Sequence, residues 1–278
     1  MASALPPSSG ERLLRQNEVG RRKQKHHAWG ERMIDLFFPE QATCPLCGFA
    51  FAHEAKGWSK VHLCDRCARG CEEIVGGICR ICGRPDAGPV CRECEQADHL
   101  FVTARAYGRY HGVIEASIKG YKYQGIEALL PVLGEWVTEA YLRYYGEDRS
   151  VRLVPVPMHP IKQANRGFNQ SEQLTKYICR ELKLPYVNIL KRVQAGDSQA
   201  MRKRKERGYA KENPFAVRES QEPIEIRPRR LRQEENPIAG QTVLLVDDVL
   251  TTGSTADACA GVLYQLDAVA VHVLTVAR

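Results

Sequence analysis

The stretch TVLLVDDVLTTGST, residues 242–255, constrains the possible fold more than any other part of this 278-residue chain. Its first five residues, 242–246, are mostly aliphatic and predict a buried strand, and a helix is expected from about residue 255 to residue 266. The acids Asp247 and Asp248 lie between the two. Open α/β sheets bind ligands beyond the carboxyl ends of their strands. A ligand site is therefore expected at this turn.

The residues of the turn indicate the chemistry of the ligand. Small residues let successive backbone N–H groups converge, hydroxyl groups add donors, and the positive end of the helix dipole lies behind them, so the loop predicts a phosphate site. Carboxylates repel phosphate, but they accept hydrogen bonds from two vicinal hydroxyls or bind hydrated Mg²⁺. Together they suggest a ribose 5-phosphate. The predicted site consists of Asp247, Asp248, Thr251, Thr252, Gly253, Ser254 and Thr255.

An alternative is a strand followed by solvated acids, as in a receiver domain. Such acids come early in that fold, whereas these lie about thirty residues from the end of the sequence, and the Thr-Thr-Gly-Ser-Thr loop has no receiver counterpart. The ligand-site reading is therefore favoured.

The rest of this half of the chain alternates between strand and helix patterns. Strands are expected at 100–107, 151–156 and 269–276, and helices at 112–123, 126–145 and 168–182. This alternation predicts an α/β domain with a mostly parallel sheet flanked by helices on both faces.

A second anion site is expected after the strand at 151–156. The segment VPVPMHP forms a rigid turn, and Arg166, next to a glycine, is expected at the start of the following helix, with Lys162 nearby. In isolation, Arg166 would be a surface arginine.

Nine of the 11 cysteines lie between residues 44 and 94, in four Cys-x-x-Cys pairs and one extra thiol, Cys71. Two such pairs complete a four-thiolate Zn²⁺ site with no open position, so two structural zinc sites are expected. A disulfide or redox role is the less favoured alternative. Sequential pairing of the Cys-x-x-Cys motifs is preferred, although their spacing leaves an interleaved arrangement open. His53, His62 and His99 are possible but unnecessary metal ligands. Cys179 and Cys259 are expected in the core. The expected ligands are Cys44, Cys47, Cys64 and Cys67 for one site and Cys79, Cys82, Cys91 and Cys94 for the other.

The distribution of charge and of apolar residues limits the possible location and domain organisation of the protein. The formal net charge of +7 is concentrated in two basic blocks, 1–30 and 201–232. No apolar run reaches the length of about 20 residues that a membrane helix needs, so no membrane span is expected. The first residues lack the apolar core of a signal peptide, so a cytoplasmic protein is expected. The predicted organisation is a basic mobile arm at 1–32, a double zinc-ribbon module at 33–98, and a ligand-binding domain at 99–278 with a disordered insert at 218–239.

The stretch 242–255 closely resembles the phosphoribosyl-pyrophosphate (PRPP) signature of type I phosphoribosyltransferases. That resemblance implies that Asp247 and Asp248 serve the ribose hydroxyls and that residues 251–255 bind the 5-phosphate, with Mg²⁺ accompanying PRPP. PRPP also carries a pyrophosphate group, and the second anion site, at Arg166, is expected to bind it.

With the cysteine pairs included, the chain resembles the ComF family of competence-associated proteins, in which a zinc module precedes a phosphoribosyltransferase-like domain. The matching text is CPLCG, CRICG, YHGVIEASIKGYKYQG, VPVPMHP, RGFNQ and VLLVDDVLTTGST, within 33–215 and 240–278. The basic arm and the insert depart from the family pattern. The family usually has an arginine, a glutamine and an Arg/Asn pair in a flexible segment that covers the pocket. Their plausible counterparts here, in uncertain register, are Arg192, Gln199, Arg207 and Asn213.

The resemblance implies handling of single-stranded DNA during natural transformation, alongside a helicase-like partner. The run Tyr121, Lys122 and Tyr123 could stack on bases. We favour this binding role with PRPP, or a related phosphoribosyl ligand, as ligand or regulator. The alternative is an active phosphoribosyltransferase of nucleotide salvage, for which residues 119–123 offer only weak candidates for base recognition; enzymatic activity and the acceptor base stay open. The expected nucleic-acid contacts are Arg202, Lys203, Arg204 and Lys205.

Overall fold

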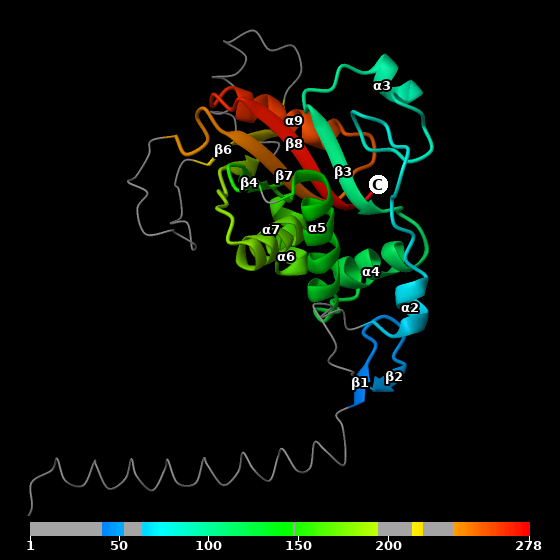
Figure 1. The fold of residues 1–278 in the computed structure, drawn as a ribbon. Helices are drawn as coiled ribbons and strands as arrows, with labels where there is room; N and C mark the ends of the chain where they lie inside the picture. The colour runs from blue at the N-terminus through cyan, green and yellow to red at the C-terminus, as the bar shows by residue number, and fades with distance from the viewer. Residues whose placement is uncertain (1–40, 53–62, 147, 194–212, 219–235) are drawn as a thin grey trace, which may run out of the picture.

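Figure 1 shows the computed structural model, which describes residues 41–52, 63–146, 148–193, 213–218 and 236–278. Several sequence predictions lie outside these ranges. They concern the arm at 1–32, most of the insert at 218–239, the basic residues 202–205, and the residues His53, His62, Gln199 and Arg207.

The centre of the molecule is a parallel sheet of four strands. The strands are β3 (Thr103–Gly108), β8 (Ala270–Ala277), β7 (Thr242–Val249) and β4 (Arg152–Pro155), in that spatial order. Every neighbouring pair runs parallel. The predicted fold class, an α/β domain with a mostly parallel sheet, is confirmed.

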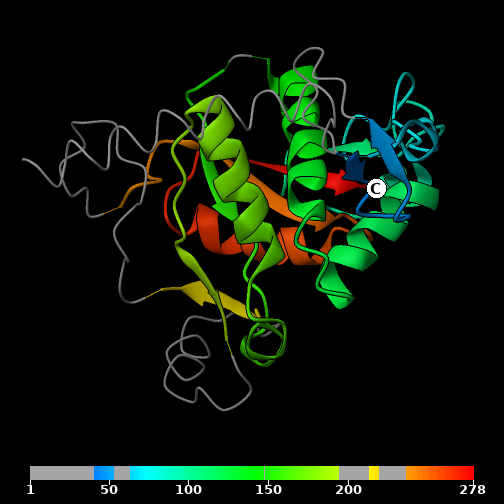
Figure 2. The ribbon, with the colours of Figure 1, turned by 90° about the horizontal axis from the view of Figure 1, so that it is seen from below.

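Helices cover both faces of the sheet because successive side chains of its strands point to opposite sides. On one face, Leu244 and Val246 of β7 pack in a buried core with α4 (Gly112–Tyr123), α5 (Leu129–Tyr145) and α7 (Gln170–Leu182). On the other, Val243 and Leu245 pack against α9 (Ser254–Tyr264). Figure 2 shows the sheet between these two layers.

A short antiparallel hairpin extends the α9 face. It consists of β5 (Leu190–Arg192) and β6 (Phe215–Val217), and the fully buried Leu190 and Phe215 join the same core as α9. Near the end of the predicted insert at 218–239, the chain returns to this core at Ile238, which is fully buried there.

The cysteine-rich segment contains the two-stranded sheet of β1 (Gln41–Thr43) and β2 (Ala50–Ala52) and the short helices α2 (Asp65–Arg69) and α3 (Arg92–Gln96). From about residue 72 onward it runs along the outside of β3, whereas β1 and β2 lie away from that strand (Figure 1). The N–H of Ala104 donates to Ile81 O at 2.7 Å, and the N–H of Ile74 donates to Tyr107 O at 2.9 Å. Unpaired groups of an edge strand invite unwanted pairing, and this segment satisfies several of them.

The opposite edge strand, β4, is also covered. Backbone bonds join Leu153 to Pro185 O at 3.1 Å and Val187 to Leu153 O at 2.9 Å, so the chain after α7 runs alongside it.

One strand boundary and one helix differ from the sequence prediction in ways that affect the site. Strand β7 continues to Val249, so Asp247 and Asp248 belong to the strand and do not follow it. A helix that the sequence analysis did not predict, α6 (Pro160–Arg166), begins with proline, which suits the first helical position because its missing N–H costs nothing there. Within the described part of the chain, no helix combines the length and the apolar character needed to cross a membrane.

Candidate functional site

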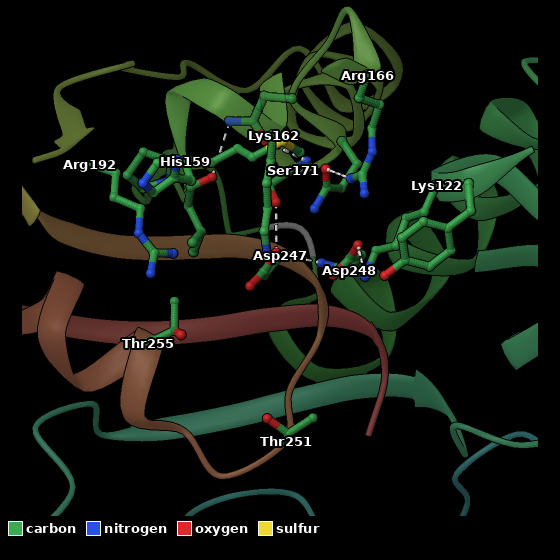
Figure 3. A pocket seen from close by; sticks show the side chains of 16 residues that line it. Lys122, His159, Lys162, Arg166, Ser171, Arg192, Asp247, Asp248, Thr251 and Thr255 are labelled. Atoms are coloured by element: carbon green, nitrogen blue, oxygen red, sulfur yellow. Dashed lines mark hydrogen bonds and ion pairs between the residues drawn. The ribbon is translucent and has the colours of Figure 1, made fainter. Parts of the chain in front are cut away.

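A pocket of about 410 Å³ opens at the carboxyl ends of β4 and β7, where the predicted ligand site was expected. Its walls come from the end of α4, the β4–α6 turn, α6, the start of α7, β5, the end of β7 and the loop that leads into α9 (Figure 3). The acidic, basic and histidine residues that line it are Lys122, His159, Lys162, Arg166, Arg192, Asp247 and Asp248.

Asp247 lies at the base of this pocket. Its Oδ1 accepts a hydrogen bond from Ser171 Oγ at 2.7 Å and another from the backbone N–H of Asp248 at 2.9 Å. Burial and the negative charge of Asp248 raise the pKa of Asp247 to about 7. The Ser171 hydroxyl fixes the orientation of the carboxyl group, and no local sequence pattern indicates this contact.

Asp248 is 5% exposed and forms an ion pair with Lys122, whose Nζ lies 2.5 Å from Asp248 Oδ2. Because the two acids are adjacent in a strand, their side chains point to opposite sides, and Asp248 points toward the α4 face of the sheet. The ion pair balances one of the two negative charges in the pocket.

The predicted phosphate loop, residues 251–255, begins where β7 ends. Thr251 and Thr255 line the pocket, and Thr251, Gly253 and Thr255 line an adjoining cavity of about 40 Å³. Thr252 and Ser254 are exposed, and their hydroxyl oxygens lie 3.1 Å apart. The loop leads directly into α9, whose N-cap is Gly253.

Arg166 lines the pocket, but its place in the fold differs from the prediction. It is the last residue of α6 and precedes α7 by four positions, so it does not begin a helix. Its Nη1 donates to Gln170 Oε1 at 2.5 Å, and its guanidinium lies 5.4 Å from the centre of the Tyr123 ring. These contacts orient the side chain along the pocket wall.

Within the described part of the chain, three of the pocket's cations have no carboxylate partner. Among the described residues, no ion pair involves Lys162, Arg166 or Arg192, whereas Lys122 is paired. Unpaired cations around one concavity favour a ligand with several negative charges.

Other predicted residues have different positions. Tyr121 is 3% exposed and packs against the Phe168 ring, so it cannot stack on a base, whereas Tyr123 is 73% exposed. Lys119 pairs with Glu115 on the same helix. Asn213 donates to Ala258 O at 2.7 Å and anchors β6 to α9.

His99 is not a ligand of either cysteine cluster. Its Nδ1 lies 2.9 Å from Asp257 Oδ2 of α9, and its ring stacks on Phe101. A Cβ atom on Gly253 would lie 3.0 Å from each of these rings. The two rings therefore pack against the phosphate loop.

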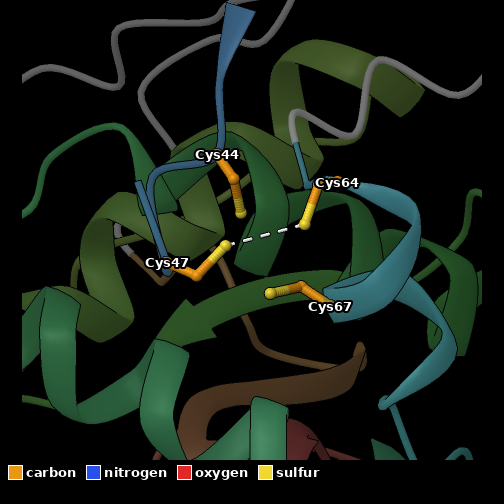
Figure 4. A group of neighbouring side chains, drawn as sticks. All are labelled: Cys44, Cys47, Cys64 and Cys67. Carbon is orange, nitrogen blue, oxygen red and sulfur yellow. Dashed lines mark hydrogen bonds between the residues drawn. The ribbon is translucent and has the colours of Figure 1, made fainter. Parts of the chain in front are cut away.

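The cysteines form two sequential clusters. The sulfurs of Cys44, Cys47, Cys64 and Cys67 lie within 4.8 Å of one another, and Figure 4 shows them converging on one point. The same holds for Cys79, Cys82, Cys91 and Cys94. The described coordinates thus support sequential pairing and not the interleaved alternative.

The geometry of these clusters fits a tetrahedral metal. Sulfurs bound to one Zn²⁺ at about 2.3 Å lie about 3.8 Å apart, and the separations of Cys47 from Cys64 and of Cys82 from Cys91 are 3.6 Å. Both clusters can therefore hold a metal ion in a closed, structural site. Cys71 is outside them and contacts Cys67 O, while Cys179 and Cys259 are fully buried in the core, as predicted.

Comparison with known proteins gives relatives over most of the chain. No family model matches it. It is 25% identical to competence protein ComFC of Bacillus subtilis over 226 residues, covering 76% of this chain and 84% of that protein. It is 27% identical to DNA utilization protein YhgH of Salmonella typhimurium, covering 84% of this chain and 96% of that protein. It is 32% identical to competence protein F of Haemophilus influenzae over 127 residues, covering 45% of this chain and 49% of that protein. The chain is thus similar, over most of its length, to proteins named for competence and for DNA utilization.

Proposed function

We propose that the chain binds PRPP, or a related phosphoribosyl ligand, together with Mg²⁺ in the 410 Å³ pocket, and that it acts on single-stranded DNA during DNA uptake. The observation that carries the ligand proposal is the division of charge within one pocket. Two carboxyl groups lie at its base, and around its walls lie three cations that form no ion pair with any described residue.

This division matches the two chemical ends of the ligand. The carboxylates of Asp247 and Asp248 accept hydrogen bonds from ribose hydroxyls, and their oxygens are the donors that Mg²⁺ prefers. Lys162, Arg166 and Arg192 neutralise the pyrophosphate charge. The 5-phosphate occupies the side nearest Thr251 and Thr255, in front of the N-terminus of α9.

The role in DNA uptake is supported by the relatives, which include proteins named for competence and for DNA utilization. The basic residues 202–205 remain the proposed contacts for the DNA backbone, with exposed Tyr123 as a stacking surface. A helicase-like partner remains a prediction.

One observation favours the transferase alternative. With its pKa raised to about 7, Asp247 can exchange a proton near neutral pH, which acid–base steps require. If the protein is a transferase, pyrophosphate release from PRPP should appear with at least one base of a panel and disappear in the Asp247→Asn/Asp248→Asn variant.

Calorimetric titration of the full chain with Mg²⁺ and PRPP tests the ligand proposal. Asp247→Asn/Asp248→Asn and Arg166→Ala should each weaken binding at least about tenfold, because each removes a charge-assisted contact. Arg180→Ala is the matched control, since Arg180 is an exposed arginine of α7 that stacks on Tyr177 away from the pocket. Equal binding by all variants would contradict the proposal.

The DNA proposal has a separate test. Affinity for a single-stranded oligonucleotide should fall steeply with salt, and replacing Arg202, Lys203, Arg204 and Lys205 with alanine should both weaken binding and reduce the salt slope. Binding that is indifferent to salt would exclude a phosphate-backbone contact.

A further inference from the structure

Arg278 lies between the second cysteine cluster and the phosphate loop. Its Nη2 donates to Cys82 Sγ at 3.1 Å. Its Nη1 donates to Leu250 O at 3.2 Å and also to Thr251 O. One guanidinium therefore connects a predicted metal ligand with the two carbonyls at which the phosphate loop begins.

The backbone of Arg278 is also fixed. Its N–H donates to Gly108 O at 3.0 Å, its own carbonyl accepts from the N–H of Tyr110 at 3.0 Å, and the N–H of Leu250 donates to Ala277 O at 3.0 Å. A guanidinium has five donors in a rigid plane and no acceptor, so it suits a position between two carbonyls and a sulfur. A compact ammonium would span these acceptors less well.

The cluster itself is fixed to the sheet on its other side. Gly83 has φ +70°, and a Cβ there would lie 2.5 Å from Ala104 O, so the turn lies directly against the backbone of β3. The next segment of chain returns to the same loop, because His99 and Phe101 follow the cluster and pack against Gly253. The loop is thus contacted at its start and in its middle by residues tied to the second cluster.

We infer that the second cysteine cluster supports the phosphate loop, and that Arg278 is the positioning residue that couples metal occupancy of this cluster to ligand binding in the pocket. Metal binding fixes Cys82 Sγ in place, Arg278 then fixes the carbonyls of Leu250 and Thr251, and the donors of the loop stay arranged for a phosphate group. The part concerning the ligand rests on the proposed function. The first cluster has no such link among the described contacts.

Hydrogen exchange in the ligand-free, metal-loaded full chain tests the link without any ligand. Amides of residues 250–256 should exchange about tenfold faster in Arg278→Ala than in the wild type, while amides of β7 at 243–246 should be unchanged. Arg278→Lys should restore part of the protection. Arg105→Ala is the matched control, because Arg105 donates to Arg80 O in the same cluster at 3.1 Å but does not contact the loop. Unchanged exchange at 250–256 in Arg278→Ala would overturn the inference.

A spectroscopic measurement tests the coupling from the metal side. With Co²⁺ in place of zinc, adding Mg²⁺ and PRPP should shift the sulfur-to-cobalt charge-transfer bands in the wild type and in Arg105→Ala, but not in Arg278→Ala, because coupling between two sites is reciprocal. A shift of equal size in Arg278→Ala would remove Arg278 from the coupling. If PRPP fails to bind the wild type, the proposed function fails, and the exchange measurement still decides whether Arg278 positions the loop.

Discussion

The two cysteine clusters have the same ligand type and the same Cys-x-x-Cys spacing, yet they are embedded differently. In the first, Cys47 is exposed, and the buried Cys44, Cys64 and Cys67 join the core on the α4 face of the sheet. In the second, all four cysteines are buried, and the cluster lies along the edge strand β3 and contacts Arg278. One motif therefore joins the core on the α4 face in the first case, and in the second it lies along an edge strand and contacts an arginine that also contacts Leu250 O.

Disrupting each cluster in turn should have the largest effect. The Cys79→Ser/Cys82→Ser variant should lose one metal equivalent and weaken PRPP binding at least about tenfold, because the edge of β3 and the phosphate loop lose their support. Cys44→Ser/Cys47→Ser should also lose one metal equivalent but should retain binding within about twofold. Metal analysis measures the metal equivalents bound by each variant, and calorimetry measures its affinity for PRPP. If the two variants lose affinity equally, the clusters do not differ in function.

The glycines that follow each cluster's second cysteine sharpen the comparison. Gly48 and Gly83 have nearly equal φ angles, +71° and +70°, but a Cβ on Gly48 would have nothing within 4 Å, whereas one on Gly83 would collide with Ala104 O. Gly48→Ala should lower the free energy of unfolding by about 1 kcal/mol from backbone strain alone. Gly83→Ala should lower it by about 3 kcal/mol, since the clash is with backbone. Denaturant unfolding measures both, and equal losses would mean that the second cluster does not press on β3.

The pH dependence of stability separates the pocket from both clusters. The folded-state pKa of Asp247 is raised to about 7, above the unfolded value of about 4, so its contribution to stability is lost as the pH rises from about 4 to 7. Asp247→Asn should therefore raise the free energy of unfolding by about 2 kcal/mol at pH 8, after allowing for a weaker hydrogen bond with Ser171.

Metal release acts in the opposite direction, because thiolates bind protons as the pH falls. Unfolding measured from pH 5 to 8 in the wild type and in Asp247→Asn isolates the carboxyl group. A constant difference between the two curves would show that Asp247 does not titrate in this range.

The smallest effect is expected at the surface of the second cluster. Arg84 and Glu93 form an ion pair, but their side chains are 41% and 58% exposed. Arg84→Ala should change the free energy of unfolding by less than about 0.5 kcal/mol, because exposed ion pairs contribute little. A loss near that of Gly83→Ala would show that this ion pair, and not the backbone contact with β3, attaches the cluster.

Much of the fold was predictable because its signals are local. Strand and helix patterns placed β7, α4 and α7 to within a few residues, and alternation of the two types predicted the parallel sheet. The helix α6 was missed because its seven residues are too few to show a hydrophobic period and none of them is buried. The predicted end of β7 is too early, because two adjacent acids usually indicate a turn, whereas this strand continues through them to Val249.

Sequence patterns alone were enough to predict the cysteines of both clusters, the acids of the pocket and the loop beside them, since each of these depends on residue types at short, fixed spacings. The groups that contact these residues come from distant parts of the chain and are visible only in the folded molecule. Ser171 reaches Asp247 across 76 positions, and Arg278 reaches Cys82 across 196. Such pairs depend on the order of strands in the sheet and on which face a helix covers. Spacing along a chain encodes local geometry, whereas the partners of a buried charge are set by the way distant segments pack.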